Sequence, residues 1–239
     1  MTRTLSEVAH KRIREKIACG ELGPRSRLHD RALAVELGAS PGTVRAAIHR
    51  TISEGLVEYL PNSGAYVRRL GREDVGHLLD VREAMECLAV ARAAEIITIP
   101  QLRRLCDLCD AMAEIADAIQ SDGLEAAEGE RYRRLVALDM EFHETLIGVA
   151  ANLWLTKAVG DLLVMEHSAM SKPSHSPLAG MARTIRAHRA LVDALHARDA
   201  EAARSIMVEH LQHPREAALR QFGKSCAPTA SHESALANS

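Results

Sequence analysis

The sequence predicts a mostly α-helical protein with two parts: three helices plus a small β-hairpin, then an all-α antiparallel bundle of about six helices. Three observations lead to this prediction. Turn and helix-ending signals are frequent in residues 1–70, whereas residues 71–223 consist mainly of long amphipathic stretches. The composition is 47% hydrophobic but only 3% aromatic, so aliphatic side chains must fill the core. Charge divides at the same boundary, with a net +5 before residue 71 and −7 after it.

Residues 30–67 contain the helix-start, helix-end and turn signals of a helix-turn-helix followed by a β-hairpin. Asp30 can cap a short helix that Gly38 ends, and Ser40 followed by Pro41 starts a second helix. The expected elements are helices over residues 30–37 and 41–54, strands over 56–60 and 65–67, and a turn over 61–64. A helix-turn-helix with such a hairpin is a winged helix-turn-helix.

The second helix and the local positive charge predict that this part binds double-stranded DNA. Its outward face carries small and polar side chains such as Gly42, with Thr43 and Arg45 on the flanks, so the helix can approach base edges closely. Basic side chains release counterions from phosphates and give affinity without sequence information. Side chains suited to that role are Arg12, Arg14, Lys16, Arg25, Arg27, Arg68 and Arg69.

Several runs in this region resemble the winged helix of the GntR family of bacterial transcription regulators. They cover residues 28–34, 37–40, 43–45, 54–57 and 61–67. The resemblance implies operator contacts from Arg31, Ser40, Gly42, Thr43 and Arg45, and places Gly64 at the wing tip that enters the minor groove. Family members usually carry an arginine directly after that serine. This chain has Pro41 there, so the family's operator sequence does not carry over.

Residues 71–223 are predicted to form a helical domain, separated by Gly, Pro and Ser signals into six helices. We expect them over residues 73–97, 100–120, 125–150, 153–170, 178–197 and 200–222, with no strands between them. Residues 224–239, rich in Ala and Ser, are expected to be a disordered tail. No apolar run reaches the roughly 18 residues of a membrane span, and we expect a cytoplasmic protein.

The five cysteines have no disulfide framework spacing, as expected for reduced thiols. Cys106 and Cys109 have the spacing of a redox pair or half a zinc site. No second cysteine pair exists, and both residues would share a helix face with Leu102 and Leu105. We therefore expect both to be buried small hydrophobic residues.

Four residues of the helical domain have the pattern of a metal site. Asp139 and His143, four residues apart, project from one helical face. His188 and His210 each lie among apolar residues of a later amphipathic helix and are expected to point inward. Three neutral imidazoles and a carboxylate suit a divalent ion, with Zn²⁺ expected first and Ni²⁺ as the alternative. Four other histidines near helix ends or loops are expected to be exposed, namely His167, His175, His196 and His213.

The order of these four residues resembles the metal-binding branch of FCD, the helical C-terminal domain of the FadR subfamily of GntR regulators. The resemblance spans residues 74–222. It implies a metal with positions open to water or to the carboxylate of a small organic-acid effector. By the same resemblance Arg82 often faces the cavity, where it would either bind the effector's second carboxylate or pair with a neighbouring glutamate.

Together these features predict a homodimeric transcription regulator and not an enzyme. Most relatives of this kind are repressors, and a two-fold symmetric dimer would bind a pseudo-palindromic operator, with affinity set by the effector. Two alternatives remain at this point. In the first, the metal itself is the regulatory signal or a permanent structural element. In the second, the metal activates water, as in a zinc-dependent hydrolase. No general base is evident for the latter, because Glu141 and Glu144 lie on different helix faces from the ligands.

Overall fold

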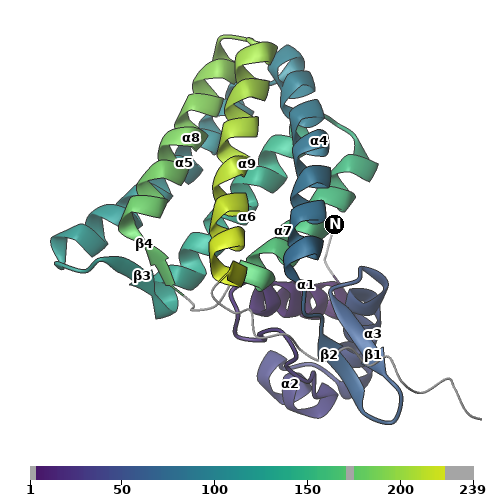
Figure 1. Cartoon of the computed structure of the whole chain (residues 1–239). Helices are drawn as coiled ribbons and strands as arrows, with labels where there is room; N and C mark the ends of the chain where they lie inside the picture. Colours follow the sequence, from purple (N-terminus) through teal and green to yellow (C-terminus); the bar gives the residue numbers. More distant parts are fainter. Residues whose placement is uncertain (1–3, 171–174, 224–239) are drawn as a thin grey trace, which may run out of the picture.

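The computed structural model describes residues 4–170 and 175–223, which fold into a small head and a bundle of long helices (Figure 1). The head lies against one end of the bundle. The expected mostly helical class, with a hairpin in the N-terminal part and a helical C-terminal part, is confirmed. The proposed tail, residues 224–239, lies outside the described residues. None of the described helices is long and apolar enough to cross a membrane.

The head contains three helices, α1 (Leu5–Ala18), α2 (Asp30–Leu37) and α3 (Pro41–Ser53). Helix α1 begins with a capping box, in which Thr4 Oγ1 accepts from the Glu7 backbone N–H and Glu7 accepts from the Thr4 backbone N–H. Helix α2 ends at Gly38, whose φ of 61° lies in the left-handed region that glycine favours. The prediction that Asp30 caps α2 is wrong. Residue 29 occupies that position, because the Asp30 carboxylate is held by Arg45, at 2.7 Å.

Helix α3 starts as its sequence predicts. The Ser40 hydroxyl accepts a hydrogen bond from the Thr43 backbone N–H, at 3.1 Å, and Pro41 lies in the first turn, where no N–H donor is needed. The helix ends at Ser53, with Glu54 as its C-cap, and Gly55 leaves the helix with a φ of 77°. One face of α3 is buried in the head, and the outward face is free for a ligand.

The wing is an antiparallel pair of strands, β1 (Val57–Leu60) and β2 (Gly64–Val67), with Leu60 opposite Gly64. The turn between them uses Asn62 at φ 60° and Gly64 at φ 112°. The segment before α2 runs along the other edge of β2. Its Leu28 N–H donates to the Ala65 carbonyl at 2.9 Å. This segment therefore fixes the wing to the start of α2.

The bundle contains six long helices. They are α4 (Arg72–Ile96), α5 (Ile99–Ser121), α6 (Gly129–Val149), α7 (Leu153–Met170), α8 (Leu178–His196) and α9 (Ala200–Gly223). Helix α4 packs on α6, α7 and α9, and α5 packs on α6 and α8. Helices α8 and α9 also pack on each other, so α4 and α5 connect this pair of helices to α6.

The bundle also contains a short strand pair that the sequence did not predict. Strand β3 (Ala126–Glu128) pairs antiparallel with β4 (His175–Pro177). The helix expected from residue 125 therefore begins only at Gly129, whose φ of 53° ends the extended segment. Alanine and glutamate favour helix locally, but pairing with a distant segment overrides that weak preference. The pair ties the beginning of α6 to the beginning of α8.

One of the two cysteines expected to be buried is on the surface. Cys109 is 1% exposed among the apolar side chains of α5, and burial raises the pKa of its thiol to about 12. Cys106 is exposed, so the prediction for this residue is wrong. It lies one position beyond Leu105, where the helix surface already turns away from the core.

The largest apolar cluster extends through the head and the bundle, and Leu105 of α5 is fully buried in it. We expect Leu105→Ala to lower the free energy of unfolding by about 2–5 kcal/mol, because the cavity it leaves adds to the lost transfer energy. Chemical denaturation followed by circular dichroism measures this. Leu124→Ala, at a position that is 51% exposed, is the control. Equal losses in the two variants would contradict this description of the core.

Candidate metal centre and DNA-binding surface

Three histidines from three helices meet inside the bundle. His143 lies on α6, His188 on α8 and His210 on α9, and their ligand nitrogens lie within 4.8 Å of one another. The Nε2 atoms of His143 and His210 are 3.2 Å apart. Two imidazole nitrogens on one tetrahedral zinc ion lie roughly 3.3 Å apart, given Zn–N distances of about 2.0–2.1 Å. The observed spacing therefore fits a shared ion.

His188 has the environment of a metal ligand. It is fully buried, and neither of its ring nitrogens has a hydrogen-bond partner among the described residues. The ring of Phe142 stacks on it, with centroids 3.8 Å apart and planes 11° from parallel, which fixes its orientation. A buried polar group without a partner costs about 1–3 kcal/mol. A metal ion shared with the other two imidazoles would supply the missing partner.

Two residues of α4 support His143 from behind. The Nδ1 atom of His143 lies 2.7 Å from Oε2 of Glu86, a contact that orients the ring and leaves Nε2 toward the other imidazoles. Glu86 also accepts a hydrogen bond from Arg82, at 2.6 Å, and Arg82 forms a second ion pair with Glu166 of α7. Arg82 is 2% exposed. In this structure it forms the ion pair with glutamate that was one of its two expected roles.

Asp139 lies beside the three histidines but is turned toward another residue. Its Oδ2 atom is 3.1 Å from Nε2 of His167, on α7, and its Oδ1 atom is 3.7 Å from Nε2 of His188. The group of mutually close ligand atoms found among the described residues contains only the three histidines. His167 was expected to be solvent-exposed, and this is wrong, since its side chain is only 19% exposed and contacts Asp139. His196 is exposed as expected, whereas His175 and His213 are partly buried.

The protonation states of these groups suit a divalent cation. Burial lowers the pKa of His188 well below its usual range, and burial together with the neighbouring His143 lowers the pKa of His210 to about 3. Burial alone would raise the pKa of Glu86, but the charges of Arg82 and His143 lower it to about 2. The site therefore presents neutral nitrogens from His188 and His210 beside the ionised carboxylate of Glu86 at neutral pH. Metal ligands must be deprotonated in this way.

Sequence reasoning missed Glu86, Glu166 and His167. Glu86 had a local signal, because it lies four residues after Arg82 on one helix face. Glu166 and His167 had none, since α7 reaches the site only through the packing of the bundle. These three side chains hold the residues that the sequence did identify, and their own positions depend on tertiary contacts.

The residues expected to contact DNA gather at the outer side of the head. Gly42 and Arg31 are exposed near the beginnings of α3 and α2. The Ser40 hydroxyl is engaged in capping and also lies 2.8 Å from the Thr43 hydroxyl. Arg45 is 64% exposed and pairs with Asp30. Gly64 lies at the wing, with the guanidinium of Arg27 against it, so that a side chain at residue 64 would meet that group at 3.3 Å.

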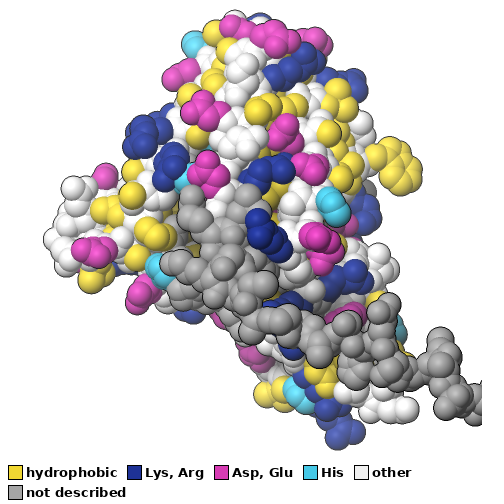
Figure 2. Space-filling view, viewed as in Figure 1, with side chains coloured by type: hydrophobic (Ala, Val, Ile, Leu, Met, Phe, Trp, Pro, Cys, Tyr) yellow, Lys and Arg dark blue, Asp and Glu magenta, His cyan; other side chains and the backbone are white. Residues whose placement is uncertain are grey.

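The cations outside α3 fall into two groups in the head, while Arg45 and Arg50 of α3 pair with Asp30 and Glu54. Those of α1 pair with carboxylates, as Arg12 does with Glu15 and Lys16 does with Glu21 and Glu36. A second group lies in the segment before α2, at the beginning of α2, or directly after β2. Within the described part of the chain, its members have no carboxylate at ion-pair distance: Arg25, Arg27, Arg31, Arg68 and Arg69. Figure 2 shows Lys and Arg side chains gathered at this end of the head. Unpaired guanidinium groups beside the wing are suited to phosphates.

Comparisons with known proteins agree with this arrangement. Residues 5–67 match the model for bacterial regulatory proteins of the gntR family, and residues 77–213 match the FCD domain. The chain is 30% identical to the "Probable D-xylose utilization operon transcriptional repressor" of Paenarthrobacter nicotinovorans, over 82% of this chain and 80% of that protein. It is 24% identical to the HTH-type transcriptional repressor RspR of Escherichia coli, over 88% and 87% of the two chains.

The fold is similar to a solved structure of E. coli McbR/YncC, with a TM-score of 0.79, 21% identity, and coverage of 92% of this chain and 100% of that one. The matched families describe regulators, which confirms the expectation that the chain is not an enzyme and removes the hydrolase alternative. The site residues, the metal and the dimer remain expectations. The chain belongs to the gntR family of bacterial regulatory proteins and is a DNA-binding transcription regulator with an FCD domain.

Proposed function

We propose that this regulator is a cytoplasmic repressor whose affinity for its operator is set by a small organic acid bound at a metal site in the FCD domain. The observation that carries the proposal is the fully buried His188, whose two ring nitrogens lack hydrogen-bond partners among the described residues. One of them lies within 4.8 Å of ligand nitrogens of His143 and His210. A site of this kind costs stability unless it binds something, and neutral imidazoles select a borderline divalent ion such as zinc or nickel.

His143, His188 and His210 would hold the ion, and Asp139 would supply the fourth ligand through the oxygen that now lies near His188. Glu86 would keep the His143 ring in place. Bound there, the metal would act as a Lewis acid that accepts a carboxylate oxygen of the effector. Arg82 lies behind this site and would bind the effector's second carboxylate only by giving up its pair with Glu166. Effector binding and a change at α7 would then occur together.

The proposed homodimer is supported by apolar side chains on the outside of the bundle. Val81 and Leu88 of α4 are 43% and 48% exposed, and Leu153 and Trp154 at the start of α7 are 85% and 86% exposed. Figure 2 shows hydrophobic side chains along the outer side of α4. A second copy covering them would place two winged helices on one pseudo-palindromic operator, and each α3 would enter the major groove.

A second candidate is that the metal is itself the signal or a permanent pin. It is favoured by the presence of four potential ligands, because a tetrahedral site with four protein ligands leaves no open position. Operator affinity measured while free zinc is buffered across the physiological range separates the candidates. If the protein is a zinc sensor, its operator affinity responds reversibly to zinc without any organic acid. If the metal is structural, the domain unfolds when the metal is removed.

Replacing His188 tests the metal site. We expect His188→Leu to weaken zinc affinity by more than the roughly 10- to 100-fold typical of removing an outer-shell partner. The metal-free variant should be more stable than the metal-free wild type by about 1 kcal/mol, because the unsatisfied imidazole is gone. Calorimetric zinc titration and denaturation of the stripped protein measure both effects. His196→Leu, on an exposed position of the same helix, is the control, and a His188→Leu protein that binds zinc normally would refute the site.

Titration with organic acids tests the effector. Zinc-loaded protein titrated with di- and tricarboxylic acids should bind at least one of them and change its operator affinity by about 5- to 150-fold, the usual range of allosteric coupling. The stripped protein should not respond to the same acid. Fluorescence anisotropy of labelled operator DNA measures the response. An acid that binds tightly through the metal and leaves operator affinity unchanged would contradict the proposal.

Replacing Arg27, which lies against the wing glycine, tests the DNA-binding surface. Arg27→Ala should weaken binding to operator and to unrelated DNA alike, and should reduce the slope of log affinity against log salt by about 0.9 for each phosphate that is no longer neutralised. Arg12→Ala removes the same charge from α1, where Glu15 already pairs with it, and should leave the slope unchanged. If the two variants have the same slope, the wing arginines do not contact DNA.

A further inference from the structure

Helix α7 contacts both the candidate metal site and the head. On one side, Glu166 pairs with Arg82 and His167 pairs with Asp139. On another side, Gly160 and Asp161 contact Arg14 of α1, and Met165 lies against the end of α3. Both sets of contacts lie within two turns of the helix. A movement of α7 beside the candidate metal site would therefore change the contacts between α7 and the head.

Arg14 is the centre of the contact between the two domains. Its Nη1 atom lies 2.8 Å from Oε2 of Glu54 and 2.5 Å from Oδ1 of Asp161, and its Nη2 atom donates to the Gly160 carbonyl at 2.6 Å. The side chains of Arg14, Glu54 and Asp161 are only 14%, 5% and 16% exposed. A planar guanidinium can hold several acceptors at fixed angles, whereas an ammonium acts as a point charge. Low exposure limits screening by salt.

Glu54 connects this contact to the DNA-reading helix. It is the C-cap of α3, and besides Arg14 it accepts from His10 at 2.9 Å and pairs with Arg50 at 3.3 Å. Burial alone would raise the pKa of Glu54, but His10 and Arg14 lower it to about 2, so the carboxylate is ionised at neutral pH. The position of the end of α3 therefore follows the position of Arg14.

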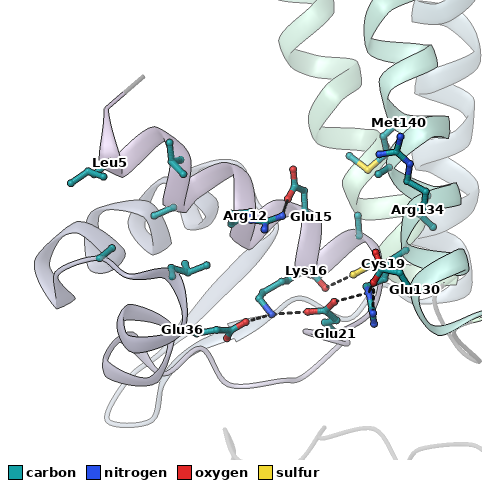
Figure 3. A pocket seen from close by; sticks show the side chains of 18 residues that line it. Leu5, Arg12, Glu15, Lys16, Cys19, Glu21, Glu36, Glu130, Arg134 and Met140 are labelled. Atoms are coloured by element: carbon teal, nitrogen blue, oxygen red, sulfur yellow. Dashed lines mark hydrogen bonds and ion pairs between the residues drawn. The ribbon is translucent and has the colours of Figure 1, made fainter. Parts of the chain in front are cut away.

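A second contact lies next to the first. A methyl group added at Gly55, just after α3, would lie 3.2 Å from Cε of Met165. The chain leaving the recognition helix therefore passes directly against α7. On the opposite side of α1 a cleft of 860 Å³ separates the head from α6 (Figure 3). The partly exposed ion pair between Glu21 and Arg133 spans that side. The head is thus held most closely at α7 and has space beside α6.

We propose that Arg14 is the positioning residue through which the state of the metal site sets the placement of the recognition helix. The proposal rests on the function proposed above for that site. Ligation that moves Asp139 or Arg82 changes their contacts with His167 and Glu166, and α7 carries the change to Asp161 and Met165. Arg14 then transfers it to Glu54 and the end of α3, while the cleft beside α6 gives the head room to tilt.

The test compares Arg14→Gln with wild type in the full chain, metal-stripped and loaded with zinc alone. Hydrogen exchange of backbone amides near the end of α3 reports whether the zinc state reaches the head. Anisotropy of labelled operator DNA reports affinity. We expect zinc to change the exchange near α3 in wild type and to leave it nearly unchanged in the variant. Any change in operator affinity between the two metal states should fall to below about 2-fold in the variant. Zinc affinity itself should stay unchanged, since Arg14 does not contact the site.

Arg12→Gln is the matched control, because it removes the same charge from the same helix, and Arg12 pairs with Glu15 inside α1. Arg14→Lys keeps the charge without the planar fork and should restore little of the coupling. If Arg14→Gln does not fold, the same measurements are made on Asp161→Asn. This variant weakens the ion pair between Arg14 and Asp161 from the α7 side and changes no residue of the head.

The outcomes separate this proposal from the proposed function. The role of Arg14 is overturned if zinc changes hydrogen exchange near α3 equally in Arg14→Gln and in wild type. It is also overturned if zinc binds to wild type without changing exchange near α3. Exchange that responds to zinc in wild type and not in Arg14→Gln supports the role of Arg14. If operator affinity nevertheless does not respond to zinc in wild type, the connection through Arg14 stands and control of the operator by zinc alone is rejected.

Discussion

The meeting of three imidazoles at one point inside the bundle is the constraint on which the rest of the helical domain depends. His143, His188 and His210 come from three helices, and they meet because α4 packs on both α6 and α9 while α5 packs on both α6 and α8. His188 stays in place through the stacked ring of Phe142, with no hydrogen bond from the described residues. A core of leucines would be more stable at this position. Binding sites often carry such a local cost in stability.

The second feature is the division of charge within the head. The cations of α1 form ion pairs with carboxylates of the head or of the bundle, and Arg14 pairs with both Glu54 and Asp161. The arginines beside the wing have no such partners within the described chain, and their charges remain available to phosphates. One surface of the head therefore carries arginines whose charges are available to DNA, and another surface forms the contact with α7. Communication between the domains need not compete with the contacts to DNA.

The sequence predicted the features that depend on local signals. Gly38, Ser40 and Pro41 mark the ends of α2 and α3, and amphipathic stretches mark the six long helices close to their observed bounds. It also indicated the three histidines: His188 and His210 because each lies among apolar residues of an amphipathic helix, and His143 because of its spacing from Asp139. It failed where a distant segment decides the outcome. The pairing of β3 with β4 replaced the first turn of a predicted helix, and Asp30 turned to Arg45 rather than capping. Likewise, His167 is partly buried only because α7 packs beside Asp139.

X-ray absorption spectroscopy of the zinc-loaded protein tests most directly whether the three imidazoles bind one metal ion. We expect a first shell of nitrogen and oxygen ligands at about 2.0–2.2 Å, with the outer-shell scattering of three imidazole rings. In His188→Leu that scattering should disappear or fall to two rings. A shell containing sulfur at about 2.3 Å, or one dominated by water without imidazole scattering, would contradict a metal site built from these histidines.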